Sequence, residues 1–423
     1  MNITESLLQY IWKTKTLLKQ SLQTTNGELI KILQPGILNT NQGPDFLMAK
    51  IIIDEVEWVG NIEIHVKSSQ WIAHRHSDDE AYNNVILHVV FENDAEIHRN
   101  IPCLELKDLI DQHLLTQYQL LTESITQIPC QNMISNVPQI IVFSQFDQMM
   151  AQRLDSKVTK LSKELQELQH NWEALFYLKL ASYLVTPVNT DAMNELTRKV
   201  PYSLFLKLSQ NLTELESVLF GTAGFLQESD EDYAKDLMKQ FHYQKNKWGL
   251  VEMKVVQWKF LRMRPSHFPT LRIAQIAAFY AHHRQAFQKI IECEKVTQVF
   301  ALFHIESSEY WRTHFSFGSA MHKAQKTSIG KSTFDILMIN VIAPFLYLYA
   351  EIQHDDAYRA KADIWLKEIK AESNRYTKIW NNVGIQANNA GESQAMIEQF
   401  TKLCSLNKCL ECKIGDKVLK LNL

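Results

Sequence analysis

The chain has 423 residues, of which 46% are hydrophobic and 22% charged, and its formal net charge is −3 at pH 7. A chain of this length holds more than one hydrophobic core, and this composition excludes a wholly disordered protein. We expect no apolar run to approach the roughly 20 residues that a membrane-spanning helix needs. The first residues lack a signal-peptide pattern, and the 6 cysteines show no regular spacing over most of the chain. These features predict a cytoplasmic protein with reduced thiols and no membrane partner.

Charge is distributed unevenly along the chain. Residues 1–130 contain 9 Lys and Arg against 17 Asp and Glu, a balance of −8, and the remaining residues contain 35 against 30, a balance of +5. Residues 235–289 alone contain 11 basic and 2 acidic residues, a balance of +9, with aromatic residues between them. Cations neutralise phosphates and aromatic rings stack on bases, so this segment has the composition of a nucleic-acid-binding element. A partly buried helical region whose lysines extend into water has the same composition.

The first part of the chain predicts a small α/β core, because helical spacing of apolar residues gives way to alternating, β-branched runs. In chain order, the expected elements are a helix over 5–20, strands over 29–33, 48–53 and 56–66, a short helix over 78–83 and a strand over 85–91. Asp54 and Glu55 form the expected turn between the second and third strands. The strand over 85–91 is expected in the interior of the sheet, since both of its faces are apolar.

After about residue 112 the apolar spacing is helical almost throughout. Pro129 and Pro138 interrupt a segment with little periodicity, which we interpret as a linker over residues 125–142. The predicted organisation is therefore an α/β domain over 1–124, the linker, and a larger all-α domain over 143–423. The fold class is multidomain, α+β followed by all-α.

Acidic and basic residues alternate on the third expected strand. Glu63, His65 and Lys67 lie two residues apart and so share one face, and Asp45 stands just before the second expected strand. In a hairpin of these two strands, Asp45 and Glu63 converge. Two carboxylates beside a cationic side chain are what a Mg²⁺-dependent phosphodiester hydrolase uses to hold its cation and orient water. A surface hairpin with its polar residues in water gives the same pattern.

The order helix, three strands, helix, strand, with Pro44-Asp45 before one strand and Glu63-Ile64-His65 in the next, resembles the PD-(D/E)xK nuclease superfamily. The resemblance covers residues 5–110 and implies a restriction-endonuclease-like core, with Asp45 and Glu63 as ligands of Mg²⁺ or Mn²⁺. It also implies that Glu5 is an accessory acid. His65 occupies the position at which the superfamily has a lysine. A neutral histidine serves as base or ligand, and Lys67 or Lys50 then supplies the positive charge; the alternative is a core that has lost catalysis.

Over its whole length the chain is also similar to a bacterial family described only as a domain of unknown function. The residues that carry this similarity lie at 43–46, 60–65, 71–74, 87–90, 260–265, 268–274 and at the C-terminal cysteines. This similarity implies membership of the family and no activity.

Further histidines follow the predicted strand pair. His74 and His76 stand beside Asp78 and Asp79, and imidazoles with carboxylates are the ligands of a transition-metal site or supply a general acid. A hydrogen-bonding role that orients Asp45 or Glu63 is the alternative. His88, inside an apolar strand, is expected to be a core histidine.

Two motifs in the helical part bear on ligands. Cys404, Cys409 and Cys412 have the spacing C-x₄-C-x₂-C, which is typical of part of a zinc or iron–sulfur ligand set, with Cys293, Cys130 or a histidine as the fourth ligand. Chance clustering of reduced cysteines is the alternative. Arg262, Arg264 and Arg272 surround two prolines before an expected helix, which favours phosphate binding. Arginines that pair with acids give the same pattern.

These features predict a metal-dependent nuclease that acts on DNA or RNA, with Asp45 and Glu63 on the metal and His65 or Lys67 acting on water. A nuclease-like protein that binds nucleic acid or a partner without cleaving it is the main alternative. A zinc-dependent phosphoesterase that uses His74 and His76 is the third. The sequence leaves the oligomeric state open.

Overall fold

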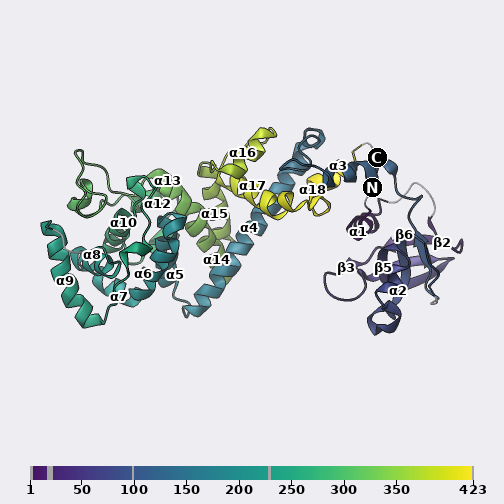
Figure 1. The fold of residues 1–423 in the computed structure, drawn as a ribbon, viewed down its shortest axis with the longest axis horizontal. Helices are drawn as coiled ribbons and strands as arrows, with labels where there is room; N and C mark the ends of the chain where they lie inside the picture. Colours follow the sequence, from purple (N-terminus) through teal and green to yellow (C-terminus); the bar gives the residue numbers. More distant parts are fainter. Residues whose placement is uncertain (1–2, 17–21, 98–99, 227–229, 422–423) are drawn as a thin grey trace. The chain divides into compact units, whose positions relative to one another are not determined.

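The computed structural model describes residues 3–16, 22–97, 100–226 and 230–421 (Figure 1). The chain divides into two compact units, each built from more than one stretch of sequence. The first unit consists of Met1–Asp147, Lys378–Ile385 and Ile397–Leu423, and the second of Gln148–Thr377 and Gln386–Met396. This division differs from the expected one, because the C-terminal segment with its cysteines belongs to the first unit.

One mixed sheet forms the centre of the first unit, with seven strands among the described residues. Its strands are β1 (Leu22–Gln23), β2 (Leu29–Gln34), β3 (Ile37–Leu38), β4 (Phe46–Ile53), β5 (Val56–Lys67), β6 (Val85–Glu92) and β7 (Cys103–Glu105). The order is β1-β2-β4-β5-β6-β7, and β3 pairs with β4. The pairs from β1 to β5 are antiparallel, whereas β5–β6 and β6–β7 are parallel. The three main predicted strands and the apolar strand are present, and the short strands β1, β3 and β7 were not predicted.

The β4–β5 hairpin is closed by the predicted turn. Asp54 and Glu55 both have positive φ angles, 42° and 70°, which is the backbone of the two-residue turns that match the twist of a hairpin. The Asp54 carboxylate accepts a hydrogen bond of 2.9 Å from the Leu29 N–H, so it also ties the turn to β2. The turn sets the register from Ile53 opposite Val56 to Ala49 opposite Gly60, and a bulge between Phe46 and Ala49 then places Phe46 opposite Ile62. Asp45 is thereby brought level with the second half of β5.

β6 is the interior strand that its apolar sequence predicts, since residues 85–90 are all buried. It runs parallel to β5, with Glu63 beside His88 and His65 beside Val90. Gly60 permits the close approach of the two strands, because a Cβ atom there would lie 2.4 Å from a methyl group of Ile86. Because β5 and β6 are parallel, the residues between them must cross over the sheet. This crossover contains α2 (Gln70–Ala73) and two 3₁₀ turns, His76–Asp78 and Glu80–Tyr82. Of the short helix expected over 78–83, only these turns form.

The first helix is shorter than predicted. α1 spans Glu5–Thr14 and ends because Lys15 adopts the left-handed conformation, with its N–H bonded to the Trp12 carbonyl. Part of the expected extension to residue 20 lies outside the described residues. Leu7, Leu8 and Ile11 are fully buried, and α1 packs beside β5. The polar residues of this helix near its start therefore lie close to the sheet.

The segment expected to be a linker is packed into the first unit. Ile128, Cys130, Ile134 and Val137 are buried, and a helix, α4 (Gln139–Glu167), begins before the predicted end of the linker. The prolines interrupt helical structure here, as the sequence indicates, but their apolar neighbours are drawn into a core. α3 (Gln112–Thr122) and α18 (Lys413–Leu419) also contribute buried leucines to this unit.

Helices make up the second unit, as predicted, with one hydrophobic core running through it. In addition to part of α4, the helices are α5 (Trp172–Leu184), α6 (Thr190–Lys199), α7 (Tyr202–Leu208), α8 (Leu212–Thr222), α9 (Asp232–Trp248), α10 (Pro269–His282), α11 (Ala286–Glu292), α12 (Val296–Leu302), α13 (Lys331–Leu337), α14 (Ala343–Gln353) and α15 (Asp356–Glu368). Two more, α16 (Arg375–Asn382) and α17 (Ala390–Lys402), have residues in both units.

One helical run contradicts the expectation that no apolar segment approaches membrane-spanning length. Lys331–Gln353 has 23 residues with a mean hydropathy of 1.6, although 72% of its apolar window is buried inside the protein. Met338–Ile342 within it is a π-helical turn, which follows from Pro344, because proline has no N–H and clashes with the preceding turn. The Lys157 ammonium donates a hydrogen bond of 3.1 Å to the Ile339 carbonyl, because Pro344 has no N–H to donate to it. Packing in the helical core thus accounts for this apolar run.

A buried carboxyl group marks the core of the helical unit. Glu216, on α8, is 1% exposed and accepts hydrogen bonds from the Tyr233 hydroxyl, at 2.9 Å, and the Ser308 hydroxyl, at 2.6 Å. Burial raises the pKa of Glu216 to about 7, although both hydrogen bonds act in the opposite direction. The folded state therefore favours the neutral carboxyl group.

We predict that Glu216 makes the helical unit less stable as the pH rises. Its raised pKa contributes stability that is fully present below about pH 4.5 and is lost as the pH rises to about 7. Glu216→Gln removes this loss, so the variant should exceed the wild type by about 3 kcal/mol at pH 8 in urea unfolding. Glu214→Gln, on the same helix and outside this network, is the control. Equal pH dependence of the wild type and Glu216→Gln would contradict the prediction.

Candidate metal centre

The β4–β5 hairpin brings Asp45 and Glu63 together. The Asp45 N–H donates a hydrogen bond of 3.2 Å to Glu63 Oε2, and the Ile64 N–H donates one of 2.8 Å to Asp45 Oδ2. Each carboxylate is thus held by the backbone of the opposite strand. Glu63 is 5% exposed, and its other oxygen, Oε1, remains directed at neighbouring side chains.

Two residues of α1 complete this carboxylate group. The Gln9 side chain donates a hydrogen bond of 2.7 Å to Asp45 Oδ1, and Glu5 accepts one of 3.2 Å from the Gln70 side chain. The negative charge of Glu5 contributes to the raised pKa of Asp45 and of Glu63, which places the expected accessory acid close to both. Gln9 was not identified from the sequence, because a single glutamine on an amphipathic helix gives no signal.

The electrostatics of the pair favour the binding of a cation. Burial raises the pKa of Asp45 to about 6 and that of Glu63 to about 9, and the charge of Asp45 adds to the effect on Glu63. Within the described chain, no ion pair between a lysine or arginine and either of these carboxylates is found. Two buried acids without a cationic partner are costly when both are ionised. A metal ion would remove that cost.

Two histidines lie beside the free oxygen of Glu63, and a third histidine lies beside one of them. Glu63 Oε1 lies 3.4 Å from His65 Nε2 and 3.3 Å from His76 Nε2, and His65 Nε2 lies 3.2 Å from His74 Nδ1. One ring nitrogen from each of the three histidines lies within 4.8 Å of the others, the only such group of His, Cys, Asp or Glu among the described residues. His76 Nε2 is buried and has no hydrogen-bond partner. An unsatisfied lone pair in such a cluster is what a metal ligand requires.

The crossover between β5 and β6 positions His74 and His76. Asp94, just beyond β6, accepts hydrogen bonds from the Ser69 N–H and hydroxyl and from the Ser68 hydroxyl, so the chain turns directly after β5. Arg75 then adopts the left-handed conformation, with φ 57°. This reverses the chain direction, so that the rings of His74 and His76, on either side of Arg75, face β5. His76 also stacks on Tyr82, with ring centroids 3.8 Å apart.

His88 orients His65 through a hydrogen bond between their rings. Its Nε2 lies 2.9 Å from His65 Nδ1, and burial lowers the pKa of both rings to about 3. Both rings are therefore neutral at pH 7. If His65 Nδ1 carries the proton and donates to His88, then His65 Nε2 presents a lone pair toward Glu63 and His74. The expected core histidine is thus an orienting partner, a role that its position inside an apolar strand does not reveal.

These distances suit one small divalent ion. Zn²⁺ binds imidazole nitrogen and carboxylate oxygen at about 2.0–2.1 Å in tetrahedral sites, so adjacent ligand atoms are about 3.3–3.4 Å apart. The three separations above are 3.2, 3.3 and 3.4 Å. The residues present therefore fit a transition-metal ion held by His65, His74 and His76, with Glu63 Oε1 beside two of these ligands.

The lysines considered for catalysis lie elsewhere. Lys67 is on the same strand, but its ammonium lies 3.8 Å from Glu92 and 3.7 Å from Asp94. Lys50 pairs at 3.2 Å with Glu57 on the surface. Period-two spacing places Lys67 on the same face as Glu63, but β5 ends at Lys67, where the acids beyond β6 attract the long side chain.

A family model described as "Protein of unknown function (DUF2851)" matches residues 5–375. The chain belongs to this family. No curated protein and no solved structure matches it. The DUF2851 match includes all the residues of the candidate metal centre, and it ends before the C-terminal cysteines, which the similarity seen in the sequence was expected to include.

The C-terminal cysteines of this DUF2851 member lie with a fourth cysteine in the first unit. Cys404, Cys409 and Cys412 line one small cavity together with Cys130, and all four are buried, reduced thiols. Burial raises the pKa of Cys130 and of Cys409 to about 12. Cys293, the other cysteine considered, belongs to the helical unit.

The predicted phosphate-binding arginines do not converge. Arg272 is 3% exposed, and its guanidinium donates to the Gln275 and Thr333 side chains at 2.8 and 3.0 Å, so it ties α10 to α13 inside the core. Arg262 and Arg264 are exposed in the loop before α10. The proline-rich spacing predicts the helix start correctly, but α10 is buried along nearly its whole length.

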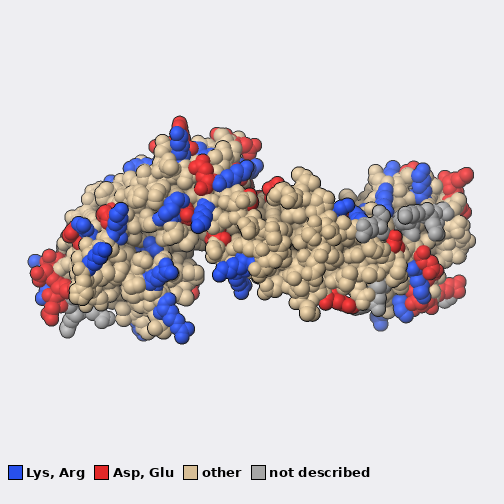
Figure 2. Space-filling view, turned by 90° about the horizontal axis from the view of Figure 1, so that it is seen from above, with Lys and Arg blue, Asp and Glu red and all other residues tan. Residues whose placement is uncertain are grey.

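The basic segment 235–289 is only partly a surface. Phe241 and Trp258 are core residues, at 1% and 4% exposure, whereas Tyr243 is 65% exposed. The Lys247 ammonium lies 5.7 Å from the centre of the Tyr243 ring and 5.1 Å from that of Trp248. On the face that Figure 2 presents, basic side chains are interspersed with acidic and uncharged ones and form no continuous band.

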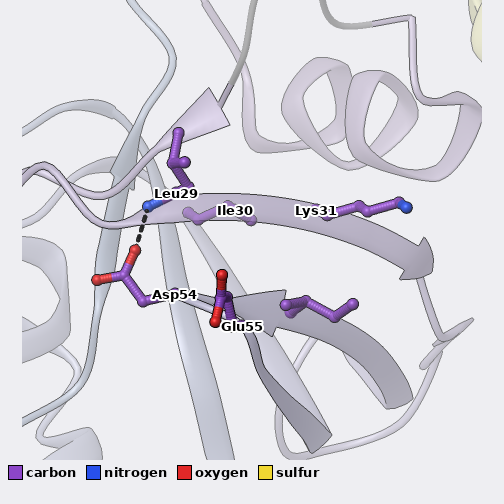
Figure 3. A pocket seen from close by; sticks show the side chains of 6 residues that line it. Leu29, Ile30, Lys31, Asp54 and Glu55 are labelled. Atoms are coloured by element: carbon purple, nitrogen blue, oxygen red, sulfur yellow. Dashed lines mark hydrogen bonds between the residues drawn. The ribbon is translucent and has the colours of Figure 1, made fainter.

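A hollow on the sheet edge lies apart from these groups. Leu29, Ile30, Lys31, Ile52, Asp54 and Glu55 line it. Figure 3 shows the Asp54 carboxylate bonded to the Leu29 backbone and so engaged in holding the turn. None of the candidate metal ligands lines this hollow.

We predict that Zn²⁺ binding at pH 7 releases about one proton from the carboxylate pair. With pKa values of about 6 and about 9, Asp45 and Glu63 together hold one proton at this pH, and a metal ligand must be ionised. Calorimetric titration in buffers of different ionisation enthalpy measures the number. Zinc taken up by the buried cysteines would displace thiol protons in every variant, so the number is the difference between proteins. Glu63→Gln should release about one proton fewer than the wild type and bind more weakly, while His242→Ala, an exposed histidine of the helical unit, should match the wild type. Equal release by the wild type and Glu63→Gln would contradict the prediction.

Proposed function

We propose that this DUF2851 protein is a metal-dependent hydrolase that cleaves phosphodiester bonds of nucleic acid in the cytoplasm. The observation that carries the proposal is the cluster of Glu63 with His65, His74 and His76, whose adjacent ligand atoms are separated by the 3.2–3.4 Å expected around one tetrahedral ion. His74 is exposed, so the cluster reaches solvent on its side. A substrate phosphate would have access there.

The arrangement of strands supports nucleic acid as the substrate class. α1 packs beside a hairpin, Asp45 stands at the start of its first strand and Glu63 lies in its second, and a parallel strand, β6, follows after the crossover. The PD-(D/E)xK nucleases have the same order of elements and acids. In the helical unit, Lys247 beside the exposed Tyr243 offers a cation and an aromatic face to a nucleotide chain.

Each residue has a chemical role in this proposal. A divalent ion held by His65, His74 and His76, with Glu63 beside it, would offset the charge of the phosphate and would lower the pKa of a water in its remaining position. Asp45, with a pKa of about 6, is ionised at neutral pH and accepts the proton of the attacking water. Gln9 and the Ile64 N–H hold the Asp45 carboxylate in place. His88 orients His65 through the hydrogen bond between their rings.

The identity of the ion is part of the proposal. Three imidazoles favour Zn²⁺ or a related transition metal, whereas Asp45 and Glu63 alone offer the oxygen ligands that Mg²⁺ or Mn²⁺ prefers. Lys67 is engaged by Glu92 and Asp94, so the metal must supply the positive charge at the site. We therefore favour the transition metal.

We predict that Asp45→Asn abolishes cleavage while it leaves the metal bound. Loss of the proton acceptor should lower the rate by about 100-fold or more, because asparagine has the size of aspartate and one oxygen to accept from the Ile64 N–H, but cannot take a proton. The assay uses labelled single-stranded, duplex and branched DNA, and RNA, with Zn²⁺, Mn²⁺ or Mg²⁺. Asp108→Asn, an exposed acid of the same unit, is the control. Cleavage by Asp45→Asn at the wild-type rate would refute the role of Asp45.

His74→Ala separates the two kinds of metal site. If the transition metal is the cofactor, this variant should bind Zn²⁺ about 100-fold more weakly and lose activity. If Mg²⁺ on Asp45 and Glu63 is the cofactor, cleavage with Mg²⁺ should persist in His74→Ala and be lost in Glu63→Gln.

One observation favours a second candidate function, a nucleic-acid- or partner-binding protein without catalysis. Glu63 Oε1 lies 3.4 Å from His65 Nε2 and 3.3 Å from His76 Nε2, and as a fourth ligand it would close the shell in the way that is typical of structural zinc. In that case the protein should bind one of the labelled nucleic acids in the same assay without cutting it. Removal of the metal should then lower thermal stability and leave no cleavage to lose.

A further inference from the structure

Four cysteines that are far apart in the sequence meet in the first unit. Cys130 lies in the irregular segment after α3, and Cys404, Cys409 and Cys412 lie in the C-terminal segment. All are at most 9% exposed. Reactive and redox-sensing cysteines need access to solvent and a stabilised thiolate, so the burial of all four argues against such a role.

A network of amides points toward the sulfur atoms. The Gln399 side-chain amide donates to Cys412 Sγ at 3.2 Å and to Cys404 Sγ at 3.7 Å. Its orientation is fixed, because Gln399 Oε1 accepts a hydrogen bond of 2.8 Å from Gln145, and Gln145 Oε1 accepts one of 2.9 Å from the Lys413 N–H. Both glutamines are buried. Donors held in this way stabilise negative charge on sulfur, as the partners of metal ligands do.

The backbone beside Cys412 is shaped for the same purpose. The N–H groups of Ile414 and Gly415 hydrogen-bond to the Cys412 thiol. Residue 415 must be glycine, because a Cβ atom there would lie 2.1 Å from the Cys409 carbonyl oxygen. The chain after the C-x₂-C pair is therefore folded tightly back against it.

We propose that Cys130, Cys404, Cys409 and Cys412 bind one structural Zn²⁺ ion. Four thiolates with a C-x₂-C pair are a usual zinc ligand set. The cavity between them has a volume of about 10 Å³, room for one water-sized sphere, and this favours a single ion over an iron–sulfur cluster of several atoms. No three of these sulfur atoms lie within 4.8 Å of one another, so the thiols must close to the separations of about 3.8 Å that tetrahedral Zn–S bonds of about 2.3 Å require.

Such an ion would fasten the C-terminal segment to the segment that follows the sheet. Cys130 contributes one ligand from the N-terminal part of the first unit, and the other three come from a stretch more than 270 residues later. The structure has no disulfide among the described cysteines. A metal crosslink supplies the equivalent constraint in a reducing compartment. The proposal is independent of the function proposed for the histidine site.

Cobalt substitution of the full-length protein tests this assignment. Co²⁺ bound by four thiolates gives an intense sulfur-to-metal charge-transfer absorption, whereas Co²⁺ at the histidine site gives none, so the two sites are distinguished in one spectrum. We expect the wild type to show this band and to bind about one thiolate-bound metal ion per chain. Cys130→Ser should lower its intensity by about a quarter, because three of the four thiolates remain. Cys293→Ser and Cys103→Ser, the two cysteines outside the cluster, should keep it.

Measurements on protein with all four cysteines intact keep the test decisive if Cys130→Ser does not fold. X-ray absorption at the zinc edge, on protein that also carries His74→Ala and His76→Ala, should show sulfur ligands at about 2.3 Å. A wild type that shows no thiolate-to-cobalt band, or a sulfur-free zinc shell, overturns the proposal. An iron–sulfur absorption in the purified protein overturns the single-ion assignment. An unchanged band intensity in Cys130→Ser overturns the role of the fourth ligand.

Discussion

The candidate site depends on one constraint, which is the burial of the Glu63 carboxylate between the Asp45 backbone and the rings of His65 and His76. One of its oxygens accepts a hydrogen bond from the Asp45 backbone, and the other faces the rings of His65 and His76. No cation among the described side chains compensates these acids, so burial raises their pKa values. The cost of such an arrangement is tolerated in proteins mainly where function requires it. A divalent ion would resolve it, since one ion would neutralise the carboxylates and use the lone pairs of the neutral histidines.

The sheet topology brings these groups together with little chain. A two-residue turn makes β4 and β5 antiparallel, and the bulge between Phe46 and Ala49 shifts their register so that Asp45 and Glu63 meet. The parallel pairing of β5 and β6 then requires a crossover, and the short crossover between them carries His74 and His76 back over β5. His88 on β6 lies directly beside Glu63 in the register. Ligands from one hairpin, one crossover and one neighbouring strand are thus held by the backbone, which keeps the site rigid before any ion is present.

The cysteine cluster follows the same physical logic in a different part of the first unit. Side chains that come from distant parts of the sequence are buried as neutral groups, with hydrogen-bond donors directed at them. At the histidine site the uncompensated groups are acids and imidazoles, which suit a catalytic or structural ion of borderline hardness. At the cysteine site they are thiols, which suit zinc in a closed shell. The helical unit has its own buried charged groups, but Glu216 and Arg272 are engaged by hydroxyl and amide partners within the core.

The sequence by itself determined the elements and the pairing of the acids. Period-two spacing on β5, the Asp54-Glu55 turn and the uninterrupted apolar run of β6 are local patterns, and each is reproduced in the structure because it is encoded within a few residues. It also indicated Cys404, Cys409 and Cys412 as one group through their spacing. It did not place the end of α1 at Thr14, and it took 125–142 for a linker, because burial of Ile128 and Ile134 depends on a core formed by other segments. Only the tertiary structure decided that His76 reaches Glu63 and His74 reaches His65, that Lys67 does not reach Glu63, that Gln9 holds Asp45, and that Cys130 joins the C-terminal thiols. Those contacts depend on a left-handed Arg75, on acids beyond the end of β6 and on how distant segments pack, and none of these is written in the spacing of the residues themselves.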